Sequence, residues 1–253
     1  MKILIHGIMG HMGREVLRLC ECGYHGATGA IGVDRSGKIP EVECYTSLNE
    51  ASGADVIIDF SHHTAIKDLC AYAIKTKTPI VVATTGHDEE ETLAIKAAAE
   101  EIPVFFSANM SLGVALLVEL AKTAARAMPD AEIEIIEKHH NRKLDAPSGT
   151  ALMVANEIKK VRPKSTFTLG RSGMAKRAPG EIGIHAIRMG NIVGEHEVMI
   201  GTPNQTITLK HEAHSRALFA EGALAAAAFL VGCEAGMYDM KSLVSGAKAP
   251  QKV

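Results

Sequence analysis

Five apolar runs of strand length recur through the first 110 residues, and they limit the fold more than any other feature of the chain. Successive runs begin about 25 residues apart, which leaves room for a crossover helix and too much chain for a hairpin. Segments with apolar residues at helical spacing fill several of the intervals. The expected strands are residues 2–6, 28–33, 55–60, 79–83 and 102–106, and the expected helices are residues 14–20, 64–75 and 89–100. This order predicts an α/β fold with a Rossmann-type doubly wound parallel sheet covered on both faces.

The pattern changes after the fifth run. Residues 114–128 have the periodicity of an amphipathic helix, and residues 132–137 alternate between apolar and polar, as in a strand with one wet face. Residues 198–200 and 206–209 flank a Gly-Thr-Pro-Asn turn and predict a β-hairpin. The sequence therefore predicts a second, smaller α+β domain with a mixed, largely open sheet. The Ala-rich residues 216–231 predict a helix that is buried on most sides and packs back on the first domain.

Composition excludes several classes of protein. The 253 residues suit one large domain or two modest ones, and 47% hydrophobic with 22% charged residues is typical of a globular chain. The longest apolar run, residues 223–233, is shorter than the ~20 residues that cross a bilayer, and the first ten residues lack the apolar centre of a signal peptide. We therefore expect neither a membrane partner nor secretion.

The cysteines and histidines give no sign of a disulfide framework or a metal site. No C-x-x-C pair, H-E-x-x-H motif or carboxylate-rich partner motif is present, so no bound metal is expected. An odd number of unpaired cysteines indicates a reducing, cytoplasmic location. The five cysteines are Cys20, Cys22, Cys44, Cys70 and Cys233.

Charge is distributed unevenly along the chain. The net charge is −2, which gives no general reason to bind nucleic acid, and the chain has no Trp to interleave with bases. Residues 138–188, however, hold eleven Lys and Arg against three acidic residues, a net charge of +8, so the remainder carries −10. This contrast predicts a local anion-binding site.

A G-x-x-G-x-x-G turn joins the first expected strand to the first expected helix. Its glycines let the backbone approach a pyrophosphate, and a helix N-terminus offers free N–H groups to an anion. Asp34 follows the second strand, where an acid accepts hydrogen bonds from an adenosine ribose, and Arg35 beside it could hold a 2′-phosphate. A plain glycine turn is the alternative interpretation. The residues expected to bind the dinucleotide here are Gly7, Ile8, Met9, Gly10, His11, Met12, Asp34 and Arg35.

Three further loops follow strands at the edge where open α/β sheets bind ligands. The first is residues 59–61, and the other two carry small hydroxyl and amide residues suited to the nicotinamide side of a cofactor. The expected contacts in these two loops are Ala83, Thr84, Thr85, Ser107, Ala108, Asn109 and Met110.

Polar chemistry is concentrated in residues 137–150, E-K-H-H-N-R-K-L-D-A-P-S-G-T. His139 and His140 supply imidazoles, the side chains most often used for proton transfer near neutral pH, and Lys143 supplies a cation. Ser148 is the expected N-cap of a helix whose first amides, from Gly149 and Thr150, would face an anion. A lone His is more often structural, but this grouping predicts an active site.

At this point the sequence resembles the 4-hydroxy-tetrahydrodipicolinate reductase (dihydrodipicolinate reductase) family. The resemblance lies in residues 7–13, 83–86, 137–150 and 190–196 and extends over nearly the whole chain. It implies NAD(P)H-dependent reduction of a small cyclic dicarboxylate to tetrahydrodipicolinate, with loss of water, in lysine and diaminopimelate biosynthesis. It also implies a homotetramer assembled through the second domain. On this basis we expect residues 1–110 and 217–253 to bind the dinucleotide, and residues 111–216 to bind substrate and form the oligomer.

The resemblance also assigns roles to residues. It makes His139 the proton donor and Lys143 a second acid or a substrate-polarising cation, and both agree with the chemistry of adding hydride to a C=C conjugated to an imine. Substrate-binding positions fall on His140, Ser148, Gly149 and Thr150, and Arg216 is a further expected carboxylate clamp.

The chain departs from the family pattern at three cofactor positions. His11 stands where Arg is usual, Ala83 where Gly is frequent, and Met110 where Phe is frequent. His11 weakens the inference of tight 2′-phosphate binding. Asp34 favours NADH and Arg35 tolerates NADPH, so use of NADH, NADPH or both is expected.

Two other functions remain open from the sequence. One is a different dehydrogenase of small dicarboxylates, similar to an aspartate dehydrogenase. The other is a dinucleotide-binding redox sensor that has kept the fold and lost the chemistry.

Overall fold

The structure is a computed structural model and describes residues 1–250. The chain forms two compact units. One contains Met1–Leu112 and the chain from Arg216 onward, and the other contains Gly113–Ser215.

The first unit is built on a seven-stranded sheet in the order β12-β6-β5-β4-β1-β2-β3, in which every neighbouring pair is parallel. The predicted parallel, doubly wound sheet is therefore confirmed. Two three-residue strands, β3 and β12, were not predicted, because neither is long enough to show a periodic pattern. The strands are β1 (Lys2–His6), β2 (Gly29–Val33), β3 (Glu43–Tyr45), β4 (Val56–Asp59), β5 (Ile80–Val82), β6 (Pro103–Phe106) and β12 (Gly236–Tyr238).

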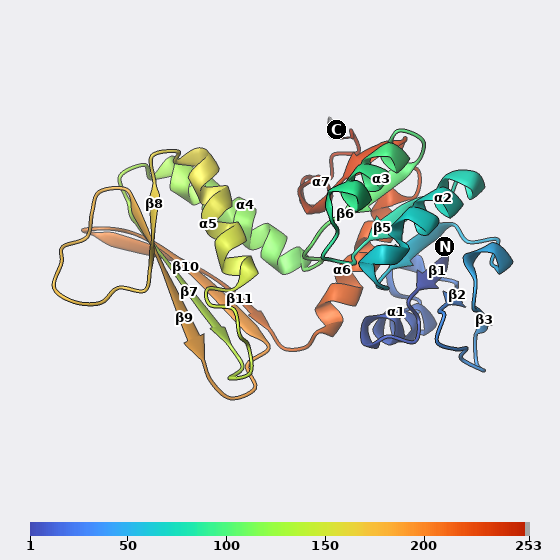
Figure 1. Ribbon diagram of the computed structural model, residues 1–253. Coiled ribbons are helices and arrows are strands. Elements are labelled where there is room, and N and C mark those ends of the chain that lie inside the picture. The colour runs from blue at the N-terminus through green and yellow to red at the C-terminus, as the bar shows by residue number, and fades with distance from the viewer. Residues whose placement is uncertain (251–253) are drawn as a thin grey trace. The chain divides into compact units, whose positions relative to one another are not determined.

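Helices cover both faces of this sheet (Figure 1). Helices α2 and α3 contribute to one core cluster with the strands, while α1 packs against α6, which also contacts β4 and β5. The predicted Ala-rich helix is confirmed as α6, and its side chains are largely buried because small residues let neighbours approach on most sides. The helices are α1 (His11–Glu21), α2 (Ile66–Thr76), α3 (Glu89–Ala99), α6 (Ala217–Leu230) and α7 (Met240–Ser245), with 3₁₀ turns at Tyr24–Gly26, Leu48–Glu50 and His63–Ala65.

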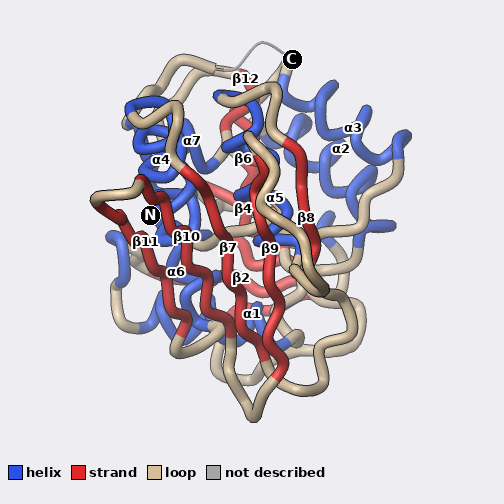
Figure 2. Tube along the Cα trace, turned by 90° about the vertical axis from the view of Figure 1, so that its left-hand side faces the viewer, coloured by secondary structure: helices blue, strands red, loops and turns tan. Residues whose placement is uncertain are grey.

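The second unit has a five-stranded mixed sheet in the order β11-β10-β7-β9-β8 (Figure 2). Strand β10 is antiparallel to β11 and β7, whereas β9 is parallel to β7 and β8. The predicted hairpin is confirmed as β10–β11, while β8 and β9 were not predicted. The strands are β7 (Glu132–His139), β8 (Thr166–Leu169), β9 (Glu181–Arg188), β10 (Gly194–Thr202) and β11 (Gln205–Ala213).

Two helices, α4 (Leu112–Ala127) and α5 (Gly149–Val161), pack on this sheet through an apolar core of Leu, Val, Ala and Ile side chains. Strand β7 alternates buried and half-buried residues, as its sequence predicted, because one face lies on that core. The last two buried residues of β7 are Glu137 and His139, so the buried face of this strand changes from apolar to polar at its carboxyl end.

Among residues 1–250, no helix has the length and hydropathy to span a bilayer. The same residues contain no cluster of three or more side chains arranged to hold a metal ion. All five cysteines are free thiols.

Candidate active site

The glycine turn lines a cavity of about 830 Å³ in the first unit. Gly7 has a φ of +87°, and a Cβ there would lie 2.6 Å from the Phe60 carbonyl oxygen. A Cβ on Gly13 would lie 2.2 Å from the Gly7 oxygen. Both positions therefore need glycine to bring the turn, the β4 loop and the start of α1 together. The volume and the backbone cradle fit a dinucleotide.

Asp34 links the second strand to the glycine turn. One carboxylate oxygen accepts from the Met9 amide at 3.0 Å, and the other accepts from the amide and hydroxyl of Ser36 at 2.9 and 2.5 Å. Burial alone would raise the pKa of Asp34, but these hydrogen bonds outweigh it and hold the pKa below its usual range. Asp34 is thus an ionised acceptor at the cavity wall, as an adenosine ribose requires.

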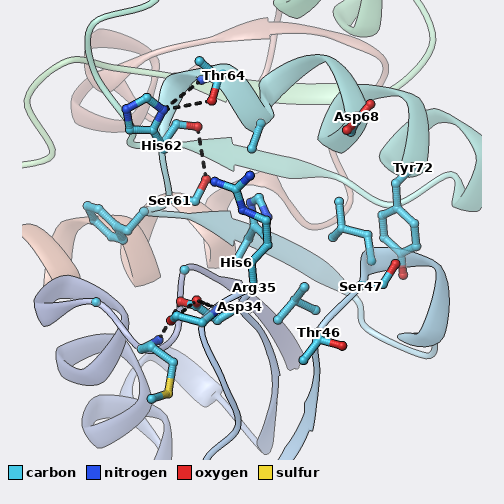
Figure 3. A pocket seen from close by; sticks show the side chains of 18 of the residues that line it. His6, Asp34, Arg35, Thr46, Ser47, Ser61, His62, Thr64, Asp68 and Tyr72 are labelled. Carbon is cyan, nitrogen blue, oxygen red and sulfur yellow. Dashed lines mark hydrogen bonds between the residues drawn. The ribbon is translucent and has the colours of Figure 1, made fainter.

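Figure 3 shows Asp34 and Arg35 on one side of this cavity and Asp68 and Tyr72 on the other. The expected residues Gly7, Met9 and Gly10 also line it. Sequence reasoning missed the remaining wall, which comes from the segment after β3 and from α2. That wall includes Thr46, Ser47, Leu48, Asn49, Asp68 and Tyr72.

A second cavity, of about 310 Å³, lies at the carboxyl ends of β4 and β5. It is lined by Ala83, Thr84 and Thr85 together with residues 60–63. Beneath this region, Nδ1 of His6 lies 2.8 Å from Oδ1 of the buried Asp59. The two predicted loops after β4 and β5 therefore meet at one edge of the sheet, the edge at which open α/β sheets usually bind ligands.

The remaining residues expected to bind the cofactor differ in how far their side chains are exposed. Ile8 and Met110 have buried side chains, so they could contact a ligand only through their backbone. His11 and Ala108 are exposed and Met12 is half-buried. The Ser107 hydroxyl donates to the Asn109 carbonyl oxygen at 2.8 Å, which folds the loop after β6 back on itself.

In the second unit, strand β7 ends in a buried carboxylate–imidazole pair. Glu137 is fully buried, and its Oε2 lies 2.6 Å from Nδ1 of His139. Arg188, from β9, donates to both carboxylate oxygens at 2.7 and 2.8 Å, and the Ser148 amide donates to Oε1 at 3.0 Å. Burial alone would raise the pKa of Glu137, but these donors outweigh it and keep the pKa below its usual range. Because an ionised carboxylate only accepts, Nδ1 of His139 carries the proton.

Strand β10 adds a second imidazole to this cluster. The rings of His139 and His196 meet edge to face, with centroids 5.2 Å apart, and Nε2 of His196 lies 3.1 Å from the Ser148 hydroxyl. Burial, followed by the neighbouring His139, lowers the pKa of His196 to about 4. His196 is therefore neutral at pH 7. Ser148 also caps α5, as predicted, by accepting from the Ala151 amide.

The loop between β7 and α5 carries the predicted cation. Nζ of Lys143 lies 2.8 Å from Oδ1 of Asp145. The contact with Lys143 holds the pKa of Asp145 below its usual range. A carboxylate of the chain itself is thus paired with Lys143, the cation expected to act on the substrate. His140 and Thr150 flank the same loop and are half-buried.

Much of the positive charge in residues 138–188 has a structural partner in the second unit. Arg188 neutralises Glu137, Arg177 pairs with Glu134, and Arg171 pairs with Glu181. Arg162 donates to carbonyl oxygens at the end of α4 and the turn after it. Residues 138–188 therefore hold fewer unpaired cations than their net charge of +8 suggests. Glu134 and Glu137, which pair with Arg177 and Arg188, lie outside this range and were not counted in that charge.

Sequence reasoning missed the roles of Glu137, Arg188 and His196. The i, i+2 spacing of Glu137 and His139 on a strand was the available signal, because such residues share a face. Nothing local pointed to Arg188. The last expected substrate residue, Arg216, is exposed at the N-cap of α6 in the first unit.

Comparison with known proteins decides the family. A model described as dihydrodipicolinate reductase, N-terminus, matches residues 1–110, and one described as dihydrodipicolinate reductase, C-terminus, matches residues 113–244. The chain belongs to the dihydrodipicolinate reductase family. A 4-hydroxy-tetrahydrodipicolinate reductase of Caldanaerobacter subterraneus subsp. tengcongensis is 48% identical over 246 residues, covering 96% of this chain and 98% of that protein.

Solved structures agree in fold. A dipicolinate-bound dihydrodipicolinate reductase from Paenisporosarcina sp. TG-14 matches with a TM-score of 0.78 and 22% identity, over 94% of this chain and 97% of that one. An aspartate dehydrogenase from Thermotoga maritima matches with a TM-score of 0.51 and 15% identity, over 89% and 94% of the two chains. At these identities each likeness shows the fold alone, so membership of the dihydrodipicolinate reductase family rests on the sequence matches.

Proposed function

We propose that this enzyme reduces 4-hydroxy-tetrahydrodipicolinate to tetrahydrodipicolinate, with loss of water, in lysine and diaminopimelate biosynthesis. The observation that carries this proposal is the buried pair of Glu137 and His139, with Lys143 four residues further along. An oriented imidazole and a cation are what a reduction of this kind needs from the protein. The family membership supports the same reaction.

A bound reduced nicotinamide supplies hydride to the substrate. Loss of the substrate's 4-hydroxyl group and a hydrogen from the neighbouring carbon, as water, first gives a C=C conjugated to the imine. As hydride adds to this C=C, negative charge develops on the ring nitrogen and the atoms conjugated to it. Lys143 stabilises this charge, and His139 delivers a proton from Nε2. Throughout this step, Glu137 accepts the hydrogen bond from Nδ1 of His139.

The substrate carboxylates are bound by Lys143 and by the start of α5. The Gly149 and Thr150 amides belong to the first turn of that helix, and the positive dipole end of a helix stabilises a carboxylate. His140 and Ser148 complete the proposed contacts, and Arg216 is the proposed second clamp.

We assign cofactor binding to residues 1–110 and 217–253, and substrate binding to residues 111–216. Asp34 suits the ribose hydroxyls of NADH, and the exposed Arg35 can meet the 2′-phosphate of NADPH. Dual use of NADH and NADPH is therefore proposed. Tight contacts to the 2′-phosphate are not expected, because His11 replaces a usual arginine.

We also propose a cytoplasmic homotetramer formed through the sheet of the second unit. The outer strand β11 has exposed or half-buried residues along its whole length, which leaves its edge open to a second copy. Size-exclusion chromatography with light scattering tests this, and a monomer at micromolar concentration contradicts it. No role in nucleic-acid or membrane binding is proposed.

The decisive experiment follows oxidation of NADH and NADPH by absorbance. The substrate is generated in place from pyruvate and aspartate semialdehyde by a dihydrodipicolinate synthase. Oxidation that depends on the synthase supports the proposal, and the ratio of the two rates gives the cofactor preference. Turnover of L-aspartate with NAD instead identifies an aspartate dehydrogenase, and cofactor binding without any turnover identifies a sensor.

A further inference from the structure

We propose that Glu137 is the positioning residue of the His139 imidazole, and that Arg188 keeps Glu137 ionised for this task. The inference rests on the proposed role of His139 as proton donor. Neither residue needs to touch the substrate for it to hold.

The hydrogen bonds around Glu137 indicate that its carboxylate is ionised. Each of its two carboxylate oxygens receives two donors. Oε1 accepts from Nη2 of Arg188 and from the Ser148 amide, and Oε2 accepts from Nη1 of Arg188 and from Nδ1 of His139. Three of these four contacts, the two from Arg188 and the one from the Ser148 amide, are donors whatever the tautomer of His139, and the guanidinium charge favours the ionised carboxylate in a fully buried site.

This arrangement decides which imidazole nitrogen takes part in proton transfer. With Glu137 accepting at Nδ1, the proton there is held in both the neutral and the charged ring, so the proton that leaves is the one on Nε2. At that nitrogen the chain provides Gly194, where even a single Cβ would lie 3.1 Å from Nε2. Because glycine has no side chain, Gly194 covers the Nε2 side of the His139 ring less than any other residue would.

A neutral amide cannot replace the carboxylate. In Glu137→Gln, the two donors at the Oε1 position fix the amide oxygen there and turn the NH₂ group toward His139. Nδ1 must then accept, and neutral His139 carries its proton on Nε2. Adding the second proton at Nδ1 would set donor against donor, so the ring loses its use as an acid.

The first test compares turnover of wild type, Glu137→Gln and Glu137→Asp. The control is Glu134→Gln, which removes an ion-paired carboxylate from the same strand on its opposite face. We expect Glu137→Gln to lower kcat by about 10² to 10³ with little change in KM. The ratio of kcat in H₂O to that in D₂O should rise, because proton delivery becomes limiting. Glu137→Asp should recover part of the loss, and an unchanged kcat or a loss confined to KM would overturn the proposal.

The second test does not depend on turnover, and it reads the tautomer in the wild-type protein. In wild-type protein labelled with ¹⁵N-histidine, the His139 signals are assigned as those missing from His139→Gln. At alkaline pH they should show the tautomer with its proton on Nδ1, and the Nε2–H tautomer would overturn the proposal. If the wild type has no reductase activity, the proposed function fails, while this spectrum still decides the role of Glu137.

Discussion

Nδ1 of His139 lies 2.6 Å from Oε2 of Glu137, two residues earlier on β7. The period-two geometry of a strand puts both side chains on the buried face. Glu137 and His139 are only two residues apart in the sequence, whereas Arg188, which donates to the same carboxylate, comes from β9. Several measurements follow from this cluster and from the dinucleotide cavity.

Replacing His139 with Gln should lower turnover by about 10² to 10³, because the proton donor is lost. Affinity for NADH should hardly change, since the dinucleotide residues lie in the other unit. Steady-state kinetics and NADH fluorescence titration measure the two quantities. His214→Gln, an exposed site, is the control, and full activity in His139→Gln would remove this residue from the mechanism.

Lys143→Ala should harm both turnover and substrate affinity. A charge aimed at an anion is lost, so we expect kcat to fall by about 10² and KM to rise roughly tenfold. Lys138→Ala is the matched control, because Lys138 is a nearby lysine bound to Glu195 at 2.9 Å. A fall in dinucleotide affinity alone would contradict the assignment of Lys143 to the substrate.

Asp145→Asn should strengthen binding of a dicarboxylate. Asp145 is ion-paired with Lys143, so a substrate carboxylate that binds Lys143 must compete with it. The ion pair is largely exposed and contributes at most about 1 kcal/mol, which corresponds to a gain of up to about fivefold in affinity. Calorimetric titration with dipicolinate measures this, with the exposed Asp130→Asn as control. Weaker binding by Asp145→Asn would show that Asp145 helps the site instead of competing for it.

Arg35→Ala should separate the two cofactors. Loss of a guanidinium that can meet the 2′-phosphate should raise KM for NADPH about tenfold and leave KM for NADH within about twofold. Parallel kinetics with both cofactors give the comparison. Equal effects on NADH and NADPH would place Arg35 against a part that the two cofactors share.

The unfolding free energy should fall as pH is lowered from 6.5 toward 4. In the folded protein the pKa of His196 is about 4, whereas the unfolded chain binds that proton near 6.5. The unfolded state therefore binds more protons in this window, and stability decreases by ~1.4 kcal/mol per pH unit, about 3 kcal/mol in all. This contribution is fully present above pH 6.5. The lowered pKa of His211 adds to the same slope.

Urea unfolding at several pH values, at one protein concentration, measures that slope. His196→Gln should reduce it, because Gln does not titrate. An identical slope in wild type and His196→Gln would show that His196 is not the group responsible. Below about pH 4.5 the lowered pKa of Glu137 adds a further loss, so the window above that value is the one that reports on His196.

The features that the sequence predicted well are local ones. The strand and helix rhythm of the first 110 residues, the Ser148 cap and the β10–β11 hairpin each depend on residues within a few positions of one another. The strands β3, β8, β9 and β12 were missed. Three or four residues cannot establish a period, and β9 buries its first four residues in succession instead of alternating.

The sequence by itself determined the doubly wound sheet, the glycine turn, the family and the grouping of histidines with Lys143, because periodicity and short motifs record local geometry and chemistry. Only the tertiary structure decided which side chains from distant parts of the sequence contact one another. Arg188 reaches Glu137 because β7 and β9 pair in parallel with His139 opposite Arg188. Hydrogen-bond register sets such a contact across 51 residues of sequence, and side-chain alternation within a strand does not specify which strand will lie beside it.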